Sequence, residues 1–420
     1  MKIKIVLLIL VSFSIKLIPQ EINKIYPDLE KLCKDLHAQP ELSLKEEKTS
    51  ERVANELRKI GFDVTEKFAG YGFVGIYKNG DGKRILLRTD LDALPIEEKT
   101  NLPFTSKHNG IMHACGHDIH MTVFVGTAKL LVENKNQWKG TLIMVGQPAE
   151  EIGKGAKMLI DAGLYEKFGV PDYALAIHVT PAQKSGSIAY CPGNAMSDAT
   201  SVTIKVNGIG GHGASPQLTI DPIVMSAQMI LSYQTIISRE ISPFDPAVIT
   251  VGYVKGGTKH NIIPDEVEMG LTIRTFNDDV KTKILSSLKS RTEKIAESFG
   301  VVKEKMPEII IAEQTPSVYN NTQLVEKLIP VLKKELGNKN VIQTIHWSAS
   351  EDFSQYSRTV HKVPSFLIWV GTASEDDWKR KEKGESIPFV HSPNFNPDYM
   401  VTIKTGLRSL YCSSLELFLK

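Results

Sequence analysis

The order of two apolar periodicities along this chain limits its fold more than any other feature. Short apolar runs typical of buried strands occupy residues 84–88, 141–145 and 173–177, and they alternate with segments of helical spacing such as 47–60 and 119–132. A chain that alternates strand and helix builds a largely parallel sheet, because each helix returns the chain across the sheet. We therefore expect an α/β fold here.

The pattern changes close to residue 199. Two half-buried strands with alternating apolar residues are predicted at 201–206 and 267–273, and two amphipathic helices at 220–237 and 280–299. This combination predicts a small α+β unit of ordinary domain size.

Helix and strand alternate again from residue 322 onward. The simplest account is one α/β domain, residues 22–198 and 312–420, interrupted by an inserted α+β domain at 199–311. The length of 420 residues agrees with two structural units, because single hydrophobic cores stop growing at roughly 250–300 residues.

The first residues have the composition of a leader. Two lysines precede an apolar run at 5–15, and Lys16 ends that run well short of the ~20 residues that a membrane span needs. This pattern is typical of a secretory signal peptide, which we place at residues 1–20. An amphipathic or buried first helix is the alternative. We expect an exported protein, periplasmic or secreted, whose mature chain does not span a membrane.

Charge and cysteine content argue against two functional classes. The 50 Lys and Arg residues are balanced by 48 Asp and Glu residues, which leaves no basic surface for nucleic acid. Four cysteines in 420 residues are too few for a disulfide scaffold. The glycines at 70–75 match G-x-G-x-x-G, but a strand follows them where the dinucleotide fingerprint needs a helix, so we interpret them as turn residues.

Acidic side chains follow the first predicted strand. Asp90 and Asp92 come directly after residues 84–88, and ligands of open α/β sheets bind beyond the carboxyl ends of strands. These carboxylates are candidates to bind a metal or to orient a metal ligand. They are also compatible with solvated turn residues, and a D-x-D pair occurs in sugar-transferase metal sites.

The densest group of metal-binding side chains lies at residues 113–120. It contains three histidines, Cys115 and an aspartate, directly ahead of a predicted helix. Packing alone explains a cluster of such ligands poorly. The spacing is Cys-x-His rather than paired C-x-x-C, which argues against a structural zinc ribbon.

Two further strand ends carry ligand-type residues. Glu150 and Glu151 follow residues 141–145, and His178 follows residues 173–177. Because parallel strands end at the same edge of a sheet, we expect these side chains to face the crevice that Asp90 faces. A sugar transferase needs neither the cysteine nor a pair of glutamates, so the metal-site interpretation is preferred.

Five motifs occur in a fixed order: Arg-Thr-Asp-Leu-Asp-Ala-Leu-Pro, Met-His-Ala-Cys-Gly-His-Asp, Gln-Pro-Ala-Glu-Glu, Gly-Gly-His-Gly-Ala-Ser-Pro and His-Ser-Pro. With them the chain resembles the aminoacylase/carboxypeptidase family of metallopeptidases. The branch it resembles most is that of hippurate hydrolase, indole-acetyl-amino-acid hydrolase and N-acetyldiaminopimelate deacetylase.

The resemblance implies a site for two divalent metal ions, with zinc, manganese, cobalt and nickel as candidates. In this resemblance Cys115 bridges the two ions, Glu150 is the general base and Asp90 orients a ligand. The implied metal ligands are Cys115, His117, Glu151, His178 and His391.

The resemblance also implies a ferredoxin-like inserted domain that forms a homodimer and closes over the substrate. His212, a candidate to stabilise the oxyanion, and Asn261 would contribute to the pocket, and Arg274 would pair with a substrate carboxylate. The expected reaction is hydrolysis of small N-acyl-amino acids. Two alternatives stay open: a metalloexopeptidase on the same fold, and a metal-binding homologue without catalysis, which the presence of Glu150 disfavours.

Overall fold

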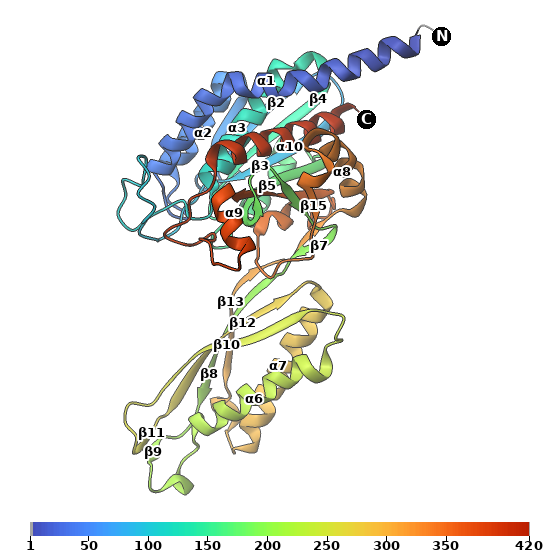
Figure 1. Cartoon of the computed structure of the whole chain (residues 1–420). Coiled ribbons are helices and arrows are strands. Elements are labelled where there is room, and N and C mark those ends of the chain that lie inside the picture. The colour runs from blue at the N-terminus through green and yellow to red at the C-terminus, as the bar shows by residue number, and fades with distance from the viewer. Residues whose placement is uncertain (1–2, 420) are drawn as a thin grey trace. The chain divides into compact units, whose positions relative to one another are not determined.

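The computed structural model describes the backbone of residues 3–419 and the side chains of residues 18–312 and 314–419. Residues 1–2 of the predicted signal peptide, and its side chains up to residue 17, therefore lie outside the described residues. The chain forms two compact units (Figure 1). The α/β unit contains Met1–Gly193, Tyr319–Ile345 and Asp352–Lys420, and the inserted unit contains Asn194–Val318 and His346–Glu351.

An eight-stranded sheet forms the centre of the α/β unit. Its central strands β4, β3, β5 and β16 run parallel to one another, which confirms the predicted mostly parallel sheet, whereas β1 and β2 are antiparallel. The strands, in their order across the sheet, are β1 (Asp63–Phe68), β2 (Gly72–Asn79), β4 (Gly140–Gln147), β3 (Lys83–Asp90), β5 (Tyr173–Lys184), β16 (Ser365–Ala373), β6 (Ile188–Tyr190) and β15 (Val341–Gln343).

Strand β5 is longer than its sequence pattern predicts. Pairing with β16 continues past His178, since Thr180 lies opposite Gly371. The predicted end of this strand at residue 177 is therefore wrong, and His178 lies inside the strand.

Helices with apolar faces cover the sheet. Within α2, Val53 and Leu57 are buried, and the helix ends where Gly61 adopts a left-handed conformation. Helix α3 is almost wholly buried, and both α1 and α10 pack against it. The helices of this unit are α1 (Ile3–Ala38), α2 (Glu47–Ile60), α3 (His117–Glu133), α4 (Gly155–Asp161), α5 (Leu164–Phe168), α8 (Thr322–Leu336), α9 (Glu375–Glu382) and α10 (Tyr399–Leu419).

Helix α1 continues without a break from the predicted leader into the core. Beyond residue 18 its apolar positions Ile22, Ile25, Leu29 and Leu32 are buried against the rest of the unit. Among the described residues, none of the helices combines the length and the apolar character that crossing a membrane requires.

The inserted unit has the connectivity β-α-β-β-α-β. Its four strands are antiparallel in the order β10-β12-β8-β13, with α6 and α7 packed together, which is the expected ferredoxin-like arrangement. The buried residues of β8 alternate along the strand and belong to the same hydrophobic core as Met229 and Tyr233 of α6. The elements are β8 (Ala199–Asn207), α6 (Pro222–Glu240), β10 (Ala247–Gly256), β12 (Glu266–Thr275), α7 (Asp278–Ser298) and β13 (Glu308–Thr315).

Two short ladders complete the described strands. In the inserted unit, β9 (Gly211–His212) pairs with β11 (Ile262–Ile263). The other ladder joins β7 (Gly193–Met196) and β14 (Val318–Asn320).

Candidate metal centre

Three neighbouring strands present polar residues at one level of the sheet. Strand β3 pairs in parallel with both β4 and β5, so that Asp90 lies opposite Gln147 and Arg88 lies opposite Ala176. His178 is two residues beyond Ala176 and therefore lies at the level of Asp90. The turn after Gln147 begins at the same level, and it carries both glutamates of the sequence motif.

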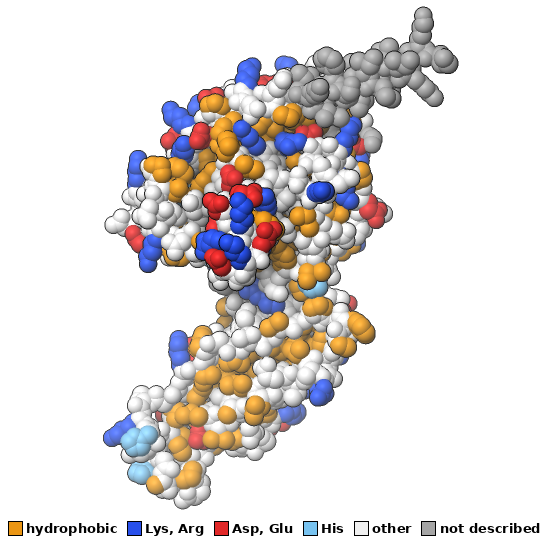
Figure 2. Space-filling model, in the orientation of Figure 1, with side chains coloured by type: hydrophobic (Ala, Val, Ile, Leu, Met, Phe, Trp, Pro, Cys, Tyr) orange, Lys and Arg blue, Asp and Glu red, His pale blue; other side chains and the backbone are white. Residues whose placement is uncertain are grey.

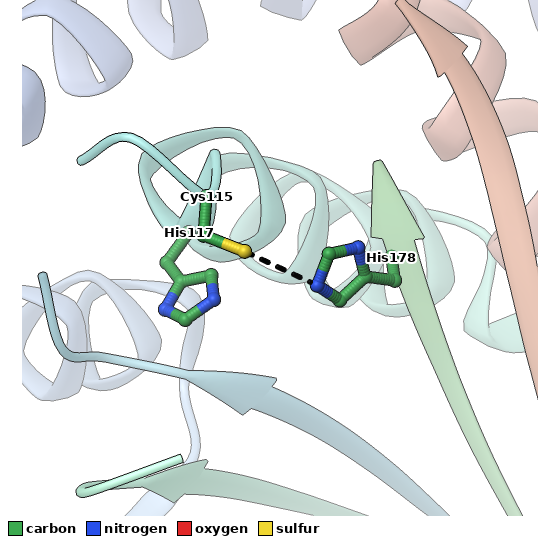
Figure 3. Close-up of side chains that lie close together, drawn as sticks. All are labelled: Cys115, His117 and His178. Carbon is green, nitrogen blue, oxygen red and sulfur yellow. Dashed lines mark hydrogen bonds between the residues drawn. The ribbon is translucent and has the colours of Figure 1, made fainter. Parts of the chain in front are cut away.

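The start of α3 brings Cys115 and His117 to this edge. Gly116 has φ of 77°, and a Cβ atom there would lie 2.6 Å from the Val179 side chain, so only glycine allows so close an approach to β5. As a result Cys115 Sγ lies 3.5 Å from His178 Nε2 (Figure 3). Cys115, His117 and His178 form a group whose ligand atoms all lie within 4.8 Å of one another.

Hydrogen bonds fix the tautomers of both imidazoles. His117 Nδ1 donates to the Asp92 carbonyl over 2.7 Å, and His178 Nδ1 donates to the Val179 carbonyl over 2.8 Å, because a carbonyl can only accept. The Nε2 lone pairs are then left for another partner. His117 Nε2 is buried without a hydrogen bond. This is the way in which histidines that bind metals are usually held.

A second group contains the same cysteine. Cys115, Glu151 and His391 also have ligand atoms within 4.8 Å of one another, and His391 Nε2 lies 3.5 Å from Glu151 Oε2. The His391 N–H donates to the carbonyl of Ala114 over 2.8 Å, which holds this irregular segment beside the cysteine. Because Cys115 belongs to both groups, the donor set fits two cations that share one thiolate.

The acidic side chains of the site favour a positive charge: burial opposes it, but Asp90, Asp92 and Glu151 raise the pKa of His117 to about 10, so a bound cation would replace a proton on this imidazole. Burial lowers the pKa of His178 to about 3, so its imidazole is neutral, as metal binding requires. Burial, together with Glu151 and Glu150, raises the pKa of the Cys115 thiol well above its usual value. A thiolate here therefore needs a cation beside it. Glu151 Oε1 is buried without a hydrogen-bond partner, so this oxygen is a further atom that could bind a cation.

The turn that carries the two glutamates has an unusual backbone. Ala149 is buried with φ of 54°, a left-handed conformation that non-glycine residues rarely adopt. The next two N–H groups both end on Asp92: Glu150 donates to Oδ1 over 3.2 Å and Glu151 donates to Oδ2 over 3.0 Å. Glu150 Oε2 lies 3.9 Å from His117 Nε2.

Asp90 lies behind the donor groups. Its Oδ1 accepts from His120 Nδ1 over 2.7 Å, and its Oδ2 accepts from Arg88 over 2.8 Å and lies 3.6 Å from His117 Nε2. Burial opposes ionisation, but His117, His120 and Arg88 hold the pKa of Asp90 well below its usual range. The His120 Nε2 atom in turn accepts from the N–H of Val179, next to His178.

Arg88 and His120 had no predicted role, and Asp92 was predicted only jointly with Asp90, as a candidate to bind a metal or to orient a metal ligand. The structure shows that Asp92, rather than Asp90, accepts from His117 and from both glutamate N–H groups. Arg88 is fully buried and also donates to Gln147 and Asp352. The only sequence signal for Asp92 was its place in the D-x-D pair, which does not say which aspartate contacts a ligand.

Two candidate residues of the inserted unit lie together on its short ladder. His212 pairs with Ile262, and the Gly213 N–H donates to the carbonyl of Asn261 over 2.9 Å. His212 is exposed, and its Nδ1 accepts from the Ala214 N–H over 3.0 Å. Its proton therefore lies on Nε2, where it can be donated to a ligand.

Arg274 lies far from that ladder. The ladder lies just before the start of β12, where the Gly210 N–H donates to Asp265. Arg274 is near the other end of β12 and donates to the carbonyl of Asp198 over 3.4 Å. The eight residue steps from Glu266 to Arg274 span roughly 25 Å at about 3.3 Å per residue. The structure thus brings His212 and Asn261 together and keeps Arg274 apart from them.

Comparison with known proteins gives matches over most of the chain. The sequence pattern described as peptidase family M20/M25/M40 matches residues 86–387. Thermostable carboxypeptidase 2 of Saccharolobus solfataricus is 37% identical over 362 residues, which cover 84% of this chain and 88% of that protein. N-acetyl-L-cysteine deacetylase of Bacillus subtilis is 33% identical over 392 residues, which cover 92% of this chain and 88% of that protein.

A solved structure has the same fold over nearly its full length. It is a Bacillus subtilis protein described as a dinuclear metal-binding peptidase of the M20 family. The two chains share 28% sequence identity with a TM-score of 0.76, over 94% of this chain and 99% of the other.

Proposed function

Because the chain belongs to peptidase family M20/M25/M40, we propose that it is a metal-dependent amidohydrolase that cleaves N-acyl-amino acids into a carboxylic acid and an amino acid. The observation that carries this proposal is the pair of donor groups that share Cys115 beside Glu150. The similarity of the chain to a deacetylase of N-acetyl-L-cysteine supports the substrate class.

The ligands that we propose for two divalent ions are Cys115, His117, Glu151, His178 and His391. When bound, such ions polarise a carbonyl and lower the pKa of a bound water towards ~7. Imidazole and thiolate donors suit zinc, cobalt or nickel, and the carboxylate extends the range to manganese. Two buried atoms without hydrogen-bond partners, His117 Nε2 and Glu151 Oε1, support this assignment, and they lie 3.7 Å apart.

Glu150 is the proposed general base. It takes a proton from the water that attacks the scissile carbonyl carbon, and it later gives this proton to the leaving amine as the C–N bond breaks. The N–H groups of Glu150 and Glu151 donate to different oxygens of Asp92, which gives these neighbouring glutamates separate, fixed places. One is then available as ligand and the other as base.

We further propose that His212 acts in the site of a second subunit. An N-acyl-amino acid is much shorter than the roughly 25 Å that β12 places between Arg274 and the His212 ladder. If His212 and Arg274 both contact substrate, the His212 and the Arg274 of one chain must therefore lie in the active sites of two different subunits. His212 Nε2–H would donate to the oxyanion that forms at the carbonyl carbon, and Arg274 would pair with the substrate carboxylate.

The surface of the inserted unit supports a homodimer. Strand β10 is an edge strand with exposed Val248 and Val254, and α6 exposes Val224 and Leu231, the latter by 71%. An uncovered edge beside apolar side chains is a usual place for strand pairing with a second copy. Figure 2 shows hydrophobic side chains gathered over one face of this unit.

A metalloexopeptidase is the second candidate, and the 37% identity with a carboxypeptidase favours it. The deciding experiment compares kcat/KM for N-acetyl- and N-benzoyl-amino acids, their C-terminal amides, dipeptides and longer peptides, with the metal varied. Preference for a small acyl group with a free carboxylate is expected. Efficient cleavage of peptides longer than three residues would contradict the proposal and support the exopeptidase.

We also propose that residues 1–20 act as a signal peptide and that the protein is exported. The lysines and apolar run at the start of the chain support this. Intact-mass measurement of the native protein tests it: a chain that has lost its first residues is expected, and an intact Met1 in a cytoplasmic fraction would refute the proposal.

A further inference from the structure

A short loop before α2, Glu41–Glu46, lies against the turn that carries both glutamates. We infer that two residues of this loop, Glu46 and Ser43, position Glu150 for catalysis. The inference rests on the proposed function only in that Glu150 is taken as the base.

Glu46 connects two unusual backbone conformations. Its carboxylate is fully buried, and one oxygen, Oε1, accepts from the Ala149 N–H over 2.8 Å and from the Leu44 N–H over 2.9 Å. Both donors are non-glycine residues in the left-handed region, with φ of 54° at Ala149 and 64° at Leu44. Each such residue costs about 1–3 kcal/mol, so the conformation persists only where partners hold it. A single buried oxygen is a partner of both.

Ser43 reaches the same turn by a separate route. Its hydroxyl donates to Asp92 Oδ2 over 2.6 Å, and the Asp92 carboxylate accepts the N–H groups of Glu150 and Glu151. Three successive N–H groups, from residues 149 to 151, thus end on two buried carboxylates. The loop before α2 holds one of these carboxylates and supplies the other.

The loop also contains a matched control. Glu41 Oε2 accepts from both the N–H and the hydroxyl of Thr49, over 2.8 and 2.9 Å, and so anchors the loop to α2. In these bonds its side chain touches neither Ala149 nor Asp92. Loss of Glu41 therefore removes a bond to α2 and leaves the bonds that Ser43 and Glu46 make to Asp92 and Ala149 in place.

The first test compares Glu46→Ala, Ser43→Ala and Glu41→Ala in the full-length, metal-loaded protein, with an N-acetyl-amino acid as substrate. Glu46→Ala is expected to lower kcat by about 10- to 100-fold with little change in KM, because misplacement by about 1 Å has effects of this size. Ser43→Ala should lower kcat less. Glu46→Gln should restore most of the loss, since an amide oxygen still accepts both N–H groups. Glu41→Ala should lower thermal stability and leave kcat close to normal.

Metal content, by elemental analysis, separates positioning of the base from positioning of a ligand. It should stay near normal in Glu46→Ala, because Glu151 is held independently by Asp92. Loss of metal in proportion to kcat would show that the loop acts through the ligand and would overturn the inference. Equal kcat in Glu46→Ala and Glu41→Ala would overturn it as well.

A second test does not depend on activity. Amide hydrogen exchange at residues 147–155 of the metal-free, full-length protein should be faster in Glu46→Ala and unchanged in Glu41→Ala. Unchanged exchange in Glu46→Ala would refute the positioning role even if the enzyme is active. Conversely, a wild-type protein that does not hydrolyse N-acyl-amino acids would refute the proposed function, while the exchange result would still decide whether Glu46 holds the turn.

Discussion

The two units hold their candidate functional residues in opposite ways. In the α/β unit, His117 and His178 are held by hydrogen bonds from Nδ1, and a third group, His391, is tied through its backbone to the segment beside Cys115. In the inserted unit, His212 is exposed on a ladder of two residue pairs and bonds to one neighbouring N–H. The first arrangement suits donors that must meet a cation at fixed distances. The second suits a donor whose partner comes from another surface.

Metal removal gives the largest effect that this comparison predicts. Chelation should abolish hydrolysis, because the proposed mechanism needs the metal ions to polarise the carbonyl and to activate the water. Adding back a divalent metal should restore hydrolysis, because the ligands stay fixed in the α/β unit. Turnover of a substrate panel before and after chelation is the measurement. Full activity in metal-free protein would refute the two-metal site.

Glu150→Gln should lower kcat by about 10²- to 10⁴-fold, the usual contribution of a general base, while metal content stays near normal. Kinetics beside elemental analysis measures both quantities. Glu151→Gln is the matched variant, and it should lose metal. If Glu150→Gln is the variant that loses metal, the two glutamates have been assigned the wrong way round.

His212→Ala should lower kcat by about 10²- to 10³-fold, as removal of an oxyanion donor does elsewhere. Mixed dimers of His212→Ala with Glu150→Gln should recover part of the activity, because one of their two sites would then have both residues intact. Absence of recovery in dimers shown to be mixed would mean that His212 acts in its own chain or only on structure.

The smallest expected effect concerns stability of the α/β unit. His37 is buried; burial lowers its pKa, but bonds to Asp118 and Glu98 outweigh this and raise it to about 9. In the unfolded chain the pKa of a histidine is about 6.5. The charge of His37 therefore adds its full contribution to the free energy of unfolding below about pH 6.5, and this contribution is lost as the pH rises through about 9. His37→Gln should lower the melting temperature of the metal-free protein by a few degrees at pH 6.

This pH dependence has its own check. The difference in melting temperature between wild type and His37→Gln should shrink as the pH rises from 6 to 10. A difference that is constant over this range would mean that His37 stabilises by packing alone, without its charge.

Much of the site could be predicted from the sequence because it depends on repeating patterns. Helix α2 was predicted at residues 47–60 and is observed at Glu47–Ile60, since Val53 and Leu57 mark its buried face and Gly61 its end. The parallel strands correctly placed Asp90 and His178 at one level of the sheet, although β5 continues past His178. The predicted family resemblance is confirmed by the match over residues 86–387 and by the relatives.

The contacts that hold the site could not be predicted in this way. Glu46 and Ala149 are 103 residues apart in sequence, and no periodicity says which buried carboxylate meets which backbone N–H. Asp92 shares its motif with Asp90, and nothing in that motif says that Asp92 accepts from the glutamate turn whereas Asp90 accepts from Arg88 and His120. His391 lies in an irregular segment, so only the family motif indicated it.

Ala149 places catalysis and heat resistance in opposition at one position. Its left-handed backbone costs about 1–3 kcal/mol, and glycine would adopt the same conformation without that cost. Selection for heat resistance alone would therefore favour glycine at position 149. The added backbone freedom would also make the position of Glu150 less defined. A variant selected in the laboratory only for survival at high temperature would therefore gain thermal stability at this position and lose kcat.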